Sequence, residues 1–143
     1  MNAYDLSFEG LVSSGTFYVN STDATTLKER DVVAITADGT VGFGTDGDPI
    51  LGVVLAIEKT GNLAAHGVVA TVQRRCSFED IATTNTTANA PVVGGLVCTD
   101  GTGKVRKMPN VTVDITNGIA LKRGNVQALV VDTTNKLASI WID

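Results

Sequence analysis

The sequence predicts an all-β protein, a small hairpin-rich barrel or sandwich, from three observations. Val and Thr each occur nineteen times in 143 residues, and β-branched side chains favour strands over helices. Fifteen glycines provide for many tight turns. Short apolar runs recur roughly every eight to twelve residues without a helical period, which is typical of sandwiches and barrels. We expect residues 1–20 to form an N-terminal strand or arm and residues 21–143 a single β domain.

The N-terminal segment concentrates aromatic residues in a chain that has few of them. Tyr4, Leu6 and Phe8 alternate with polar residues, the period-two pattern of a half-buried strand. Phe17 and Tyr18 follow a Ser/Gly-rich break. The segment is either an extended arm that docks on a partner or the first hairpin of the domain, and the pattern fits both. We predict that these five side chains contribute to partner or subunit contacts.

Two segments have the strand, Asp-Gly, strand pattern of a β-hairpin. In the first, residues 31–36 and 40–43 flank Asp38-Gly39, a dipeptide suited to the positive φ of a tight turn. A similar sequence runs from Leu96 to Val105, and each hairpin is followed by a Gly-led apolar strand. This repetition suggests two related β units.

The remaining elements are predicted to be strands joined by polar loops. Residues 50–57 are almost continuously apolar, which indicates a strand buried on both faces, and Gly52 within it indicates a bulge or a close backbone crossing. Residues 78–82 fit a short strand or a single helical turn, so at most one short helix is expected. Residues 83–89 are predicted to be a surface loop. The further expected strands cover residues 68–73, 91–98, 104–108, 111–115, 118–121, 126–131 and 137–142.

Candidate catalytic and ligand residues are isolated in the sequence. His66 has no recognisable nucleophile or orienting acid, and no nucleophile elbow or nucleotide-binding glycine motif occurs. Asp38, Asp46 and Asp48 could supply calcium ligands, but they lack the order and the closing Glu of an EF-hand loop. We therefore predict a protein that is not an enzyme and that has no cofactor and no metal site.

Charge, cysteines and hydropathy bound the environment of the chain. A net charge of −4 with sparse Lys and Arg disfavours nucleic-acid binding. Cys76 and Cys98 have no metal-ligand spacing, and two reduced, buried thiols are favoured over a disulfide. The first ten residues lack the pattern of a secretory signal, and no apolar run approaches the ~20 residues of a membrane span. We expect a protein that stays in the compartment where it is made and binds no membrane.

Several segments together resemble the capsid decoration, or cement, proteins of tailed phages. The resemblance extends roughly from Lys28 to the C-terminus. In the first half it rests on Lys28-Glu-Arg-Asp-Val-Val-Ala34, Asp38-Gly-Thr-Val41, Pro49-Ile-Leu-Gly-Val-Val-Leu55 and the strand at residues 68–73. In the second half it rests on Pro91-Val-Val-Gly94, Thr99-Asp-Gly-Thr-Gly103 and Gly118-Ile-Ala-Leu121.

The resemblance implies a β protein made in the host cytoplasm that binds the outer capsid surface of the virion. Its partner would be the major capsid protein, whose neighbouring subunits it would bridge. Homo-oligomers are implied, with a trimer favoured and a dimer possible. Two alternatives stay open: a β module of a phage tail or fibre, and a soluble carbohydrate- or calcium-binding module.

Overall fold

A computed structural model describes residues 14–59, 68–74, 77–109 and 126–142 of the chain. The all-β prediction is confirmed, because these ranges hold ten strands and a single helical element, the 3-10 turn η1 (Thr87–Asn89). No helix within them is long and apolar enough to cross a membrane.

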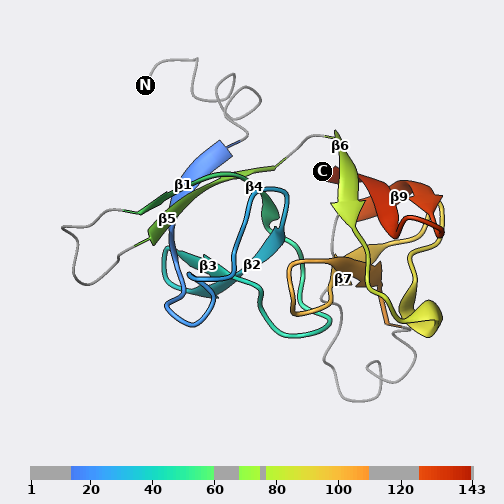
Figure 1. Cartoon of the computed structure of the whole chain (residues 1–143), viewed down its shortest axis with the longest axis horizontal. Helices are drawn as coiled ribbons and strands as arrows, with labels where there is room; N and C mark the ends of the chain where they lie inside the picture. Colours follow the sequence, from blue (N-terminus) through green and yellow to red (C-terminus); the bar gives the residue numbers. More distant parts are fainter. Residues whose placement is uncertain (1–13, 60–67, 75–76, 110–125, 143) are drawn as a thin grey trace, which may run out of the picture.

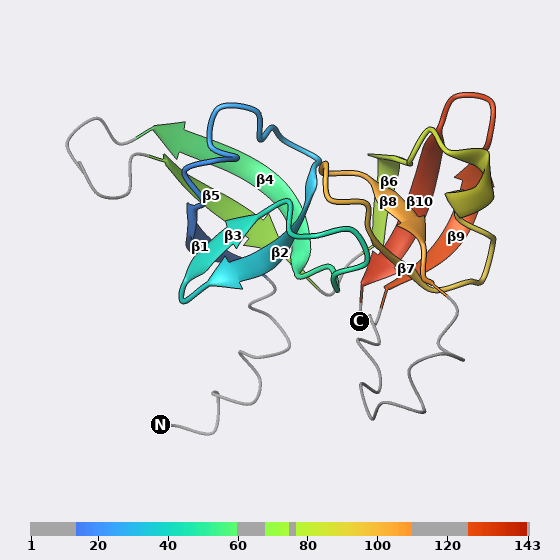
Figure 2. The same ribbon diagram turned by 90° about the horizontal axis from the view of Figure 1, so that it is seen from below.

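The first half of the chain closes into a five-stranded barrel, seen beside the strands of the second half in Figure 2. Its strand order is β1-β3-β2-β4-β5. β1 lies parallel to β3 and antiparallel to β5, which closes the barrel, and the other neighbours are antiparallel. The strands are β1 (Ser14–Val19), β2 (Val32–Ala37), β3 (Thr40–Gly42), β4 (Gly52–Lys59) and β5 (Val68–Gln73).

The N-terminal segment takes part in this barrel. β1 is paired on both sides, so Ser14–Val19 is neither a detached arm nor one side of a hairpin. Tyr4, Leu6 and Phe8 lie outside the described residues, so the role predicted for them stays a prediction.

The second half contains a three-stranded sheet and a two-stranded sheet that adjoin each other (Figure 1). The order in the first is β6-β10-β9, and β7 pairs with β8 in the second. A parallel bridge between Thr83 and Val105 and an antiparallel bridge between Leu96 and Gln127 connect the two sheets. The strands are β6 (Ser77–Ala82), β7 (Val97–Thr99), β8 (Val105–Lys107), β9 (Val126–Asp132) and β10 (Leu137–Ile142).

The paired strands β2 and β4 lie between two hydrophobic cores. Val33 and Val54 belong to the core inside the first barrel. Val32 and Val53, which are paired across the two strands, belong to the core of the second half. Because successive side chains of a strand point to opposite faces, each strand contributes to both cores. The prediction that the apolar run is buried on both faces is confirmed for its centre.

Most strand predictions agree with the structure, and one is wrong. Residues 68–73 and 137–142 are β5 and β10 with the expected bounds, and residues 78–82 fall in β6. Of the strand expected over residues 91–98, only the end is extended. The reason is a turn in which Gly94 adopts a φ of 77° and the Gly95 N–H bonds to the Val92 carbonyl. The strands expected at residues 111–115 and 118–121 lie outside the described residues.

Gly52 confirms the predicted close backbone crossing. A side chain at this position would overlap the Gln73 carbonyl oxygen of the neighbouring strand. Glycine lets β4 and β5 approach each other here. Past this point β4 carries a β-bulge, since Val54 pairs with Val72 and Ala56 with Thr71, which leaves Leu55 unpaired.

Candidate functional site

The two predicted contact residues that the structure describes have different environments. Phe17 is half-buried and packs against the core of the first barrel, so its ring is part of the fold. Tyr18, on the opposite face of β1, is 40% exposed and can be reached by another molecule. The side chains alternate because the strand has a period of two.

Exposed apolar side chains also gather on the second half, where the sequence analysis predicted no site. Trp141 of β10 is 48% exposed and lies opposite the exposed Gln127 of β9. The Gln127 side-chain amide approaches the Gly94 carbonyl at 3.5 Å, which places the turn containing Val92 and Val93 at this edge of β9. Those two valines are 56% and 63% exposed.

The sequence contained a signal for this surface. Trp141 is the only tryptophan of the chain, and tryptophan, large and partly polar, is enriched at protein interfaces. Alternation along residues 137–142 shows which side chains share a face, but only the tertiary structure shows which face is buried.

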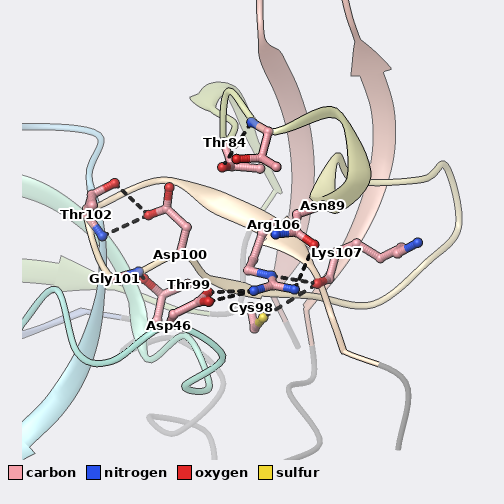
Figure 3. Close-up of polar contacts among 11 residues, drawn as sticks. Asp46, Thr84, Asn89, Cys98, Thr99, Asp100, Gly101, Thr102, Arg106 and Lys107 are labelled. Carbon is pink, nitrogen blue, oxygen red and sulfur yellow. Dashed lines mark hydrogen bonds and ion pairs between the residues drawn. The ribbon is translucent and has the colours of Figure 1, made fainter.

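Arg106 of β8 joins the two halves of the molecule (Figure 3). One guanidinium nitrogen, Nη1, donates to both carboxylate oxygens of Asp46, at 2.8 and 2.7 Å, and Nη2 donates to Asn89 Oδ1 at 3.0 Å. Asp46 belongs to the loop between β3 and β4, and Asn89 ends η1. Nε donates to the Lys107 carbonyl at 3.1 Å. The Arg106 side chain is only 13% exposed, so this contact is a structural joint.

Backbone bonds support the same joint. Thr99 of β7 donates its N–H to the Asp48 carbonyl and accepts a bond from the Gly47 N–H. Its hydroxyl donates to the Phe43 carbonyl at 3.0 Å. In the first half of the molecule, the loop after β3 is therefore fixed against β7 of the second half.

The three candidate calcium ligands are not brought together as a site. Asp46 is occupied by Arg106, and Asp48 accepts a hydrogen bond from the Thr45 N–H at 2.8 Å. Asp38 lies in the turn between β2 and β3. Within the described ranges, no group of three or more His, Cys, Asp and Glu side chains could hold a metal ion.

Among the described residues, burial raises the pKa of two titratable groups, the Cys98 thiol and the Asp31 carboxylate. Cys98 is free and fully buried, and burial raises the pKa of its thiol to about 11. A neutral thiol is a poor nucleophile. Burial also raises the pKa of Asp31, against the opposing effect of the Lys28 backbone N–H that donates to its carboxylate. His66 and Cys76 lie outside the described residues.

A surface hollow of about 210 Å³ lies on the outer side of the second half, lined by Asp80, Val130, Asp132 and residues 137–139. Typical small-molecule sites enclose roughly 300–1,000 Å³. The hollow is smaller than that range, so the exposed apolar side chains remain the strongest candidate for a functional surface.

Comparison with protein-family models, with curated proteins and with solved structures found no match for the chain.

Proposed function

We propose that this chain is a structural virion protein that binds the outer surface of an assembled phage head and bridges neighbouring major capsid subunits. The observation that carries the proposal is the exposure of the Trp141, Val92 and Val93 side chains on a scaffold whose two halves share a core. Large apolar groups on a rigid β framework suit protein contact because little conformational entropy is lost on binding.

Two of the segments that resemble decoration proteins lie next to each other in the first barrel. Asp38-Gly-Thr-Val41 forms the turn and first residues after β2, and Pro49-Ile-Leu-Gly-Val-Val-Leu55 leads into β4, which pairs with β2. The resemblance supplies the partner, the major capsid protein, and a homo-oligomer, with a trimer favoured over a dimer.

Binding of this kind stabilises a head through mass action. A protein that binds assembled capsid, but not free subunits, shifts the equilibrium towards the assembled state by RT ln(1 + [L]/Kd) for each site. A copy that touches two subunits gains further from the high effective concentration of its second contact. Neither effect requires a chemical reaction.

The direct test is co-sedimentation of the purified full chain with DNA-free heads, in expanded and unexpanded form. We expect saturable binding to the expanded form, with one fixed stoichiometry, and heads that disassemble at a higher temperature. Trp141→Ser should weaken binding at least tenfold. Trp141→Phe, which keeps an aromatic ring, is the matched control, and unfolding curves of both variants should resemble that of the wild type.

Other outcomes would replace the proposal. Binding to purified tails but not heads would favour a tail or fibre module. A rise in melting temperature with calcium or a glycan, without binding to heads, would favour a soluble ligand-binding module.

A further inference from the structure

The two halves of the molecule have the same strand topology. In the first barrel the order is β1-β3-β2-β4-β5, with β1 and β3 parallel and all other pairs antiparallel. In the second half, the two connecting bridges complete the order β6-β8-β7-β9-β10. The β6–β8 contact is parallel and the other pairs are antiparallel. Adding five to each strand number of the first barrel therefore gives the strand order and the pairing directions of the second half.

The register of the parallel contact is also the same. In the first barrel the N–H of Asn20, just after β1, donates to the Val41 carbonyl at 2.8 Å. In the second half the N–H of Thr84 donates to the Val105 carbonyl at 2.9 Å. Both residues of the second bond lie 64 positions after their counterparts in the first.

In a second pair of matched backbone bonds, the two donor residues are also 64 positions apart. The Arg30 N–H donates to the Val54 carbonyl at 2.9 Å, and the Gly94 N–H, 64 positions later, donates to the Ala128 carbonyl at 2.7 Å. Both donors have left-handed backbone geometry, with φ of 70° at Arg30 and 77° at Gly94. A positive φ is uncommon for a residue other than glycine, so its occurrence at matched positions points to one ancestral backbone.

The matched β-bulges carry the same exposed side chain. In β4 the unpaired bulge residue is Leu55, directly after Val54. In β9 it is Leu129, directly after Ala128, because Ala128 and Val130 pair with successive residues of β10. Leu55 is 42% exposed and Leu129 is 45% exposed.

Identity at an exposed position needs a reason other than packing. Other identical pairs within the matched strands, such as Val33 with Val97, are buried, and the core accounts for them. The leucines instead begin two similar exposed segments, Leu55-Ala-Ile-Glu58 and Leu129-Val-Val-Asp132. Each segment starts with two exposed apolar residues and ends with a carboxylate.

We infer that the chain is a tandem repeat of one five-stranded unit and that Leu55 and Leu129 are two equivalent contacts for a partner made of repeating subunits. The inference rests on the proposed function, since it assigns each contact to one of two neighbouring capsid subunits. The complementary surface on each subunit is an apolar depression edged by Lys or Arg, which would pair with Glu58 and Asp132. Hydrogen bonds from Asn135 and Thr134 hold the pKa of Asp132 below its usual value, so this carboxylate is charged at neutral pH.

The test compares Leu55→Ser, Leu129→Ser and the double variant for binding to expanded heads. Equivalent contacts predict that each single substitution weakens apparent affinity about tenfold, and that the two effects are similar in size. The double variant should lose about a hundredfold, within the range that the loss of bivalent attachment can produce. Ile35→Ser is the control, because Ile35 is 52% exposed and its matched residue is the buried Thr99. Its binding should equal that of the wild type.

The outcomes separate this inference from the proposed function. Wild-type binding with an unaffected double variant would overturn the paired contacts and leave the head-binding function intact. An effect of one leucine alone would overturn their equivalence. Wild-type protein that binds no heads would overturn both proposals. Hydrogen exchange reports on the repeat directly, since the amides of Thr84 and Gly94 should be protected as strongly as those of Asn20 and Arg30.

Discussion

Replacing Arg106 by Met tests whether the polar joint holds the two halves together. Met keeps an apolar stem but removes every hydrogen bond of the guanidinium. The bonds to Asp46 are worth about 1 kcal/mol or less, because the Asp46 side chain is 56% exposed and water can replace the partner. The bond to Asn89 adds about 1 kcal/mol, since Asn89 is only partly exposed. We therefore expect Arg106→Met to lower the free energy of unfolding by about 2 kcal/mol.

Urea unfolding of four proteins isolates the ionic part of this effect. Wild type, Arg106→Met, Asp46→Asn and the double variant form a double-mutant cycle, whose coupling energy we expect to be about 0.5–1 kcal/mol at low salt. The coupling should decrease in 1 M NaCl, where the Debye length is only ~3 Å. Lys107→Met is the control on the same strand, because Lys107 has an exposed side chain. It should change stability by less than about 0.5 kcal/mol.

Two results would refute the reasoning. If Arg106→Met were as stable as the wild type, the bonds in Figure 3 would contribute nothing to the joint. If the coupling energy were close to zero while Arg106→Met was still destabilised, the loss would come from packing of the arginine stem, and the pair with Asp46 would be incidental.

Further predictions concern the core, the N-terminal strand and the buried thiol. Gly52→Ala should cost about 2–3 kcal/mol in urea unfolding, because the new Cβ overlaps the Gln73 carbonyl and rigid backbone has to move. Phe17→Ala should cost about 2–3 kcal/mol, because the ring packs on the barrel core. Tyr18→Ala should cost less in unfolding than Phe17→Ala, because Tyr18 is the more exposed of the two, and should weaken binding to heads. The reverse pattern would contradict both assignments. In the folded protein, burial raises the pKa of Cys98 from 9.0 to about 11, so the contribution of the neutral thiol to folding stability is complete below pH 9 and is lost as pH rises towards 11. The difference in unfolding free energy between wild type and Cys98→Ala should therefore shrink over that interval. A constant difference would contradict the burial argument.

Local signals in the sequence predicted the strands well, because a hairpin is a local structure. Asp38-Gly39 lies in the turn between β2 and β3, and Gly39 has the positive φ that such a turn requires, at 60°. The strand prediction over residues 91–98 is wrong because the pair Gly94-Gly95 forms a turn within the apolar run. Apolar residues in that turn are exposed, and composition alone does not distinguish them from a buried strand.

The candidate surface could be predicted only in part. The aromatic residues of the first segment were visible in the sequence, yet only the paired strand shows that Phe17 faces the core and Tyr18 faces outwards. The exposure of Trp141 depends on which face of β10 the second core covers, and that core includes Val32 and Val53 from the other half of the chain. Contacts over such sequence separations leave no local pattern.

The packing of β2 and β4 against both cores also explains why the repeat is faint in the sequence. In the first unit, β4 is packed on both faces, and Gly52 allows it to approach β5 closely. In the second unit the matched strand β9 has one face exposed, and Val126 fills the core where the first unit has Gly52. The two units thus keep the same backbone bonds while their side chains meet different neighbours, so their sequences diverge wherever packing differs. An alignment of the two Asp-Gly turns would pair Gly39 with Gly101. The shift of 64 residues that relates Asn20 to Thr84 and Val41 to Val105 instead pairs it with Gly103, also at positive φ. The backbone register thus preserves the repeat even where differences in side-chain packing have removed it from the sequence. A leucine that is exposed at the same position in both units is then better explained by a partner than by the fold.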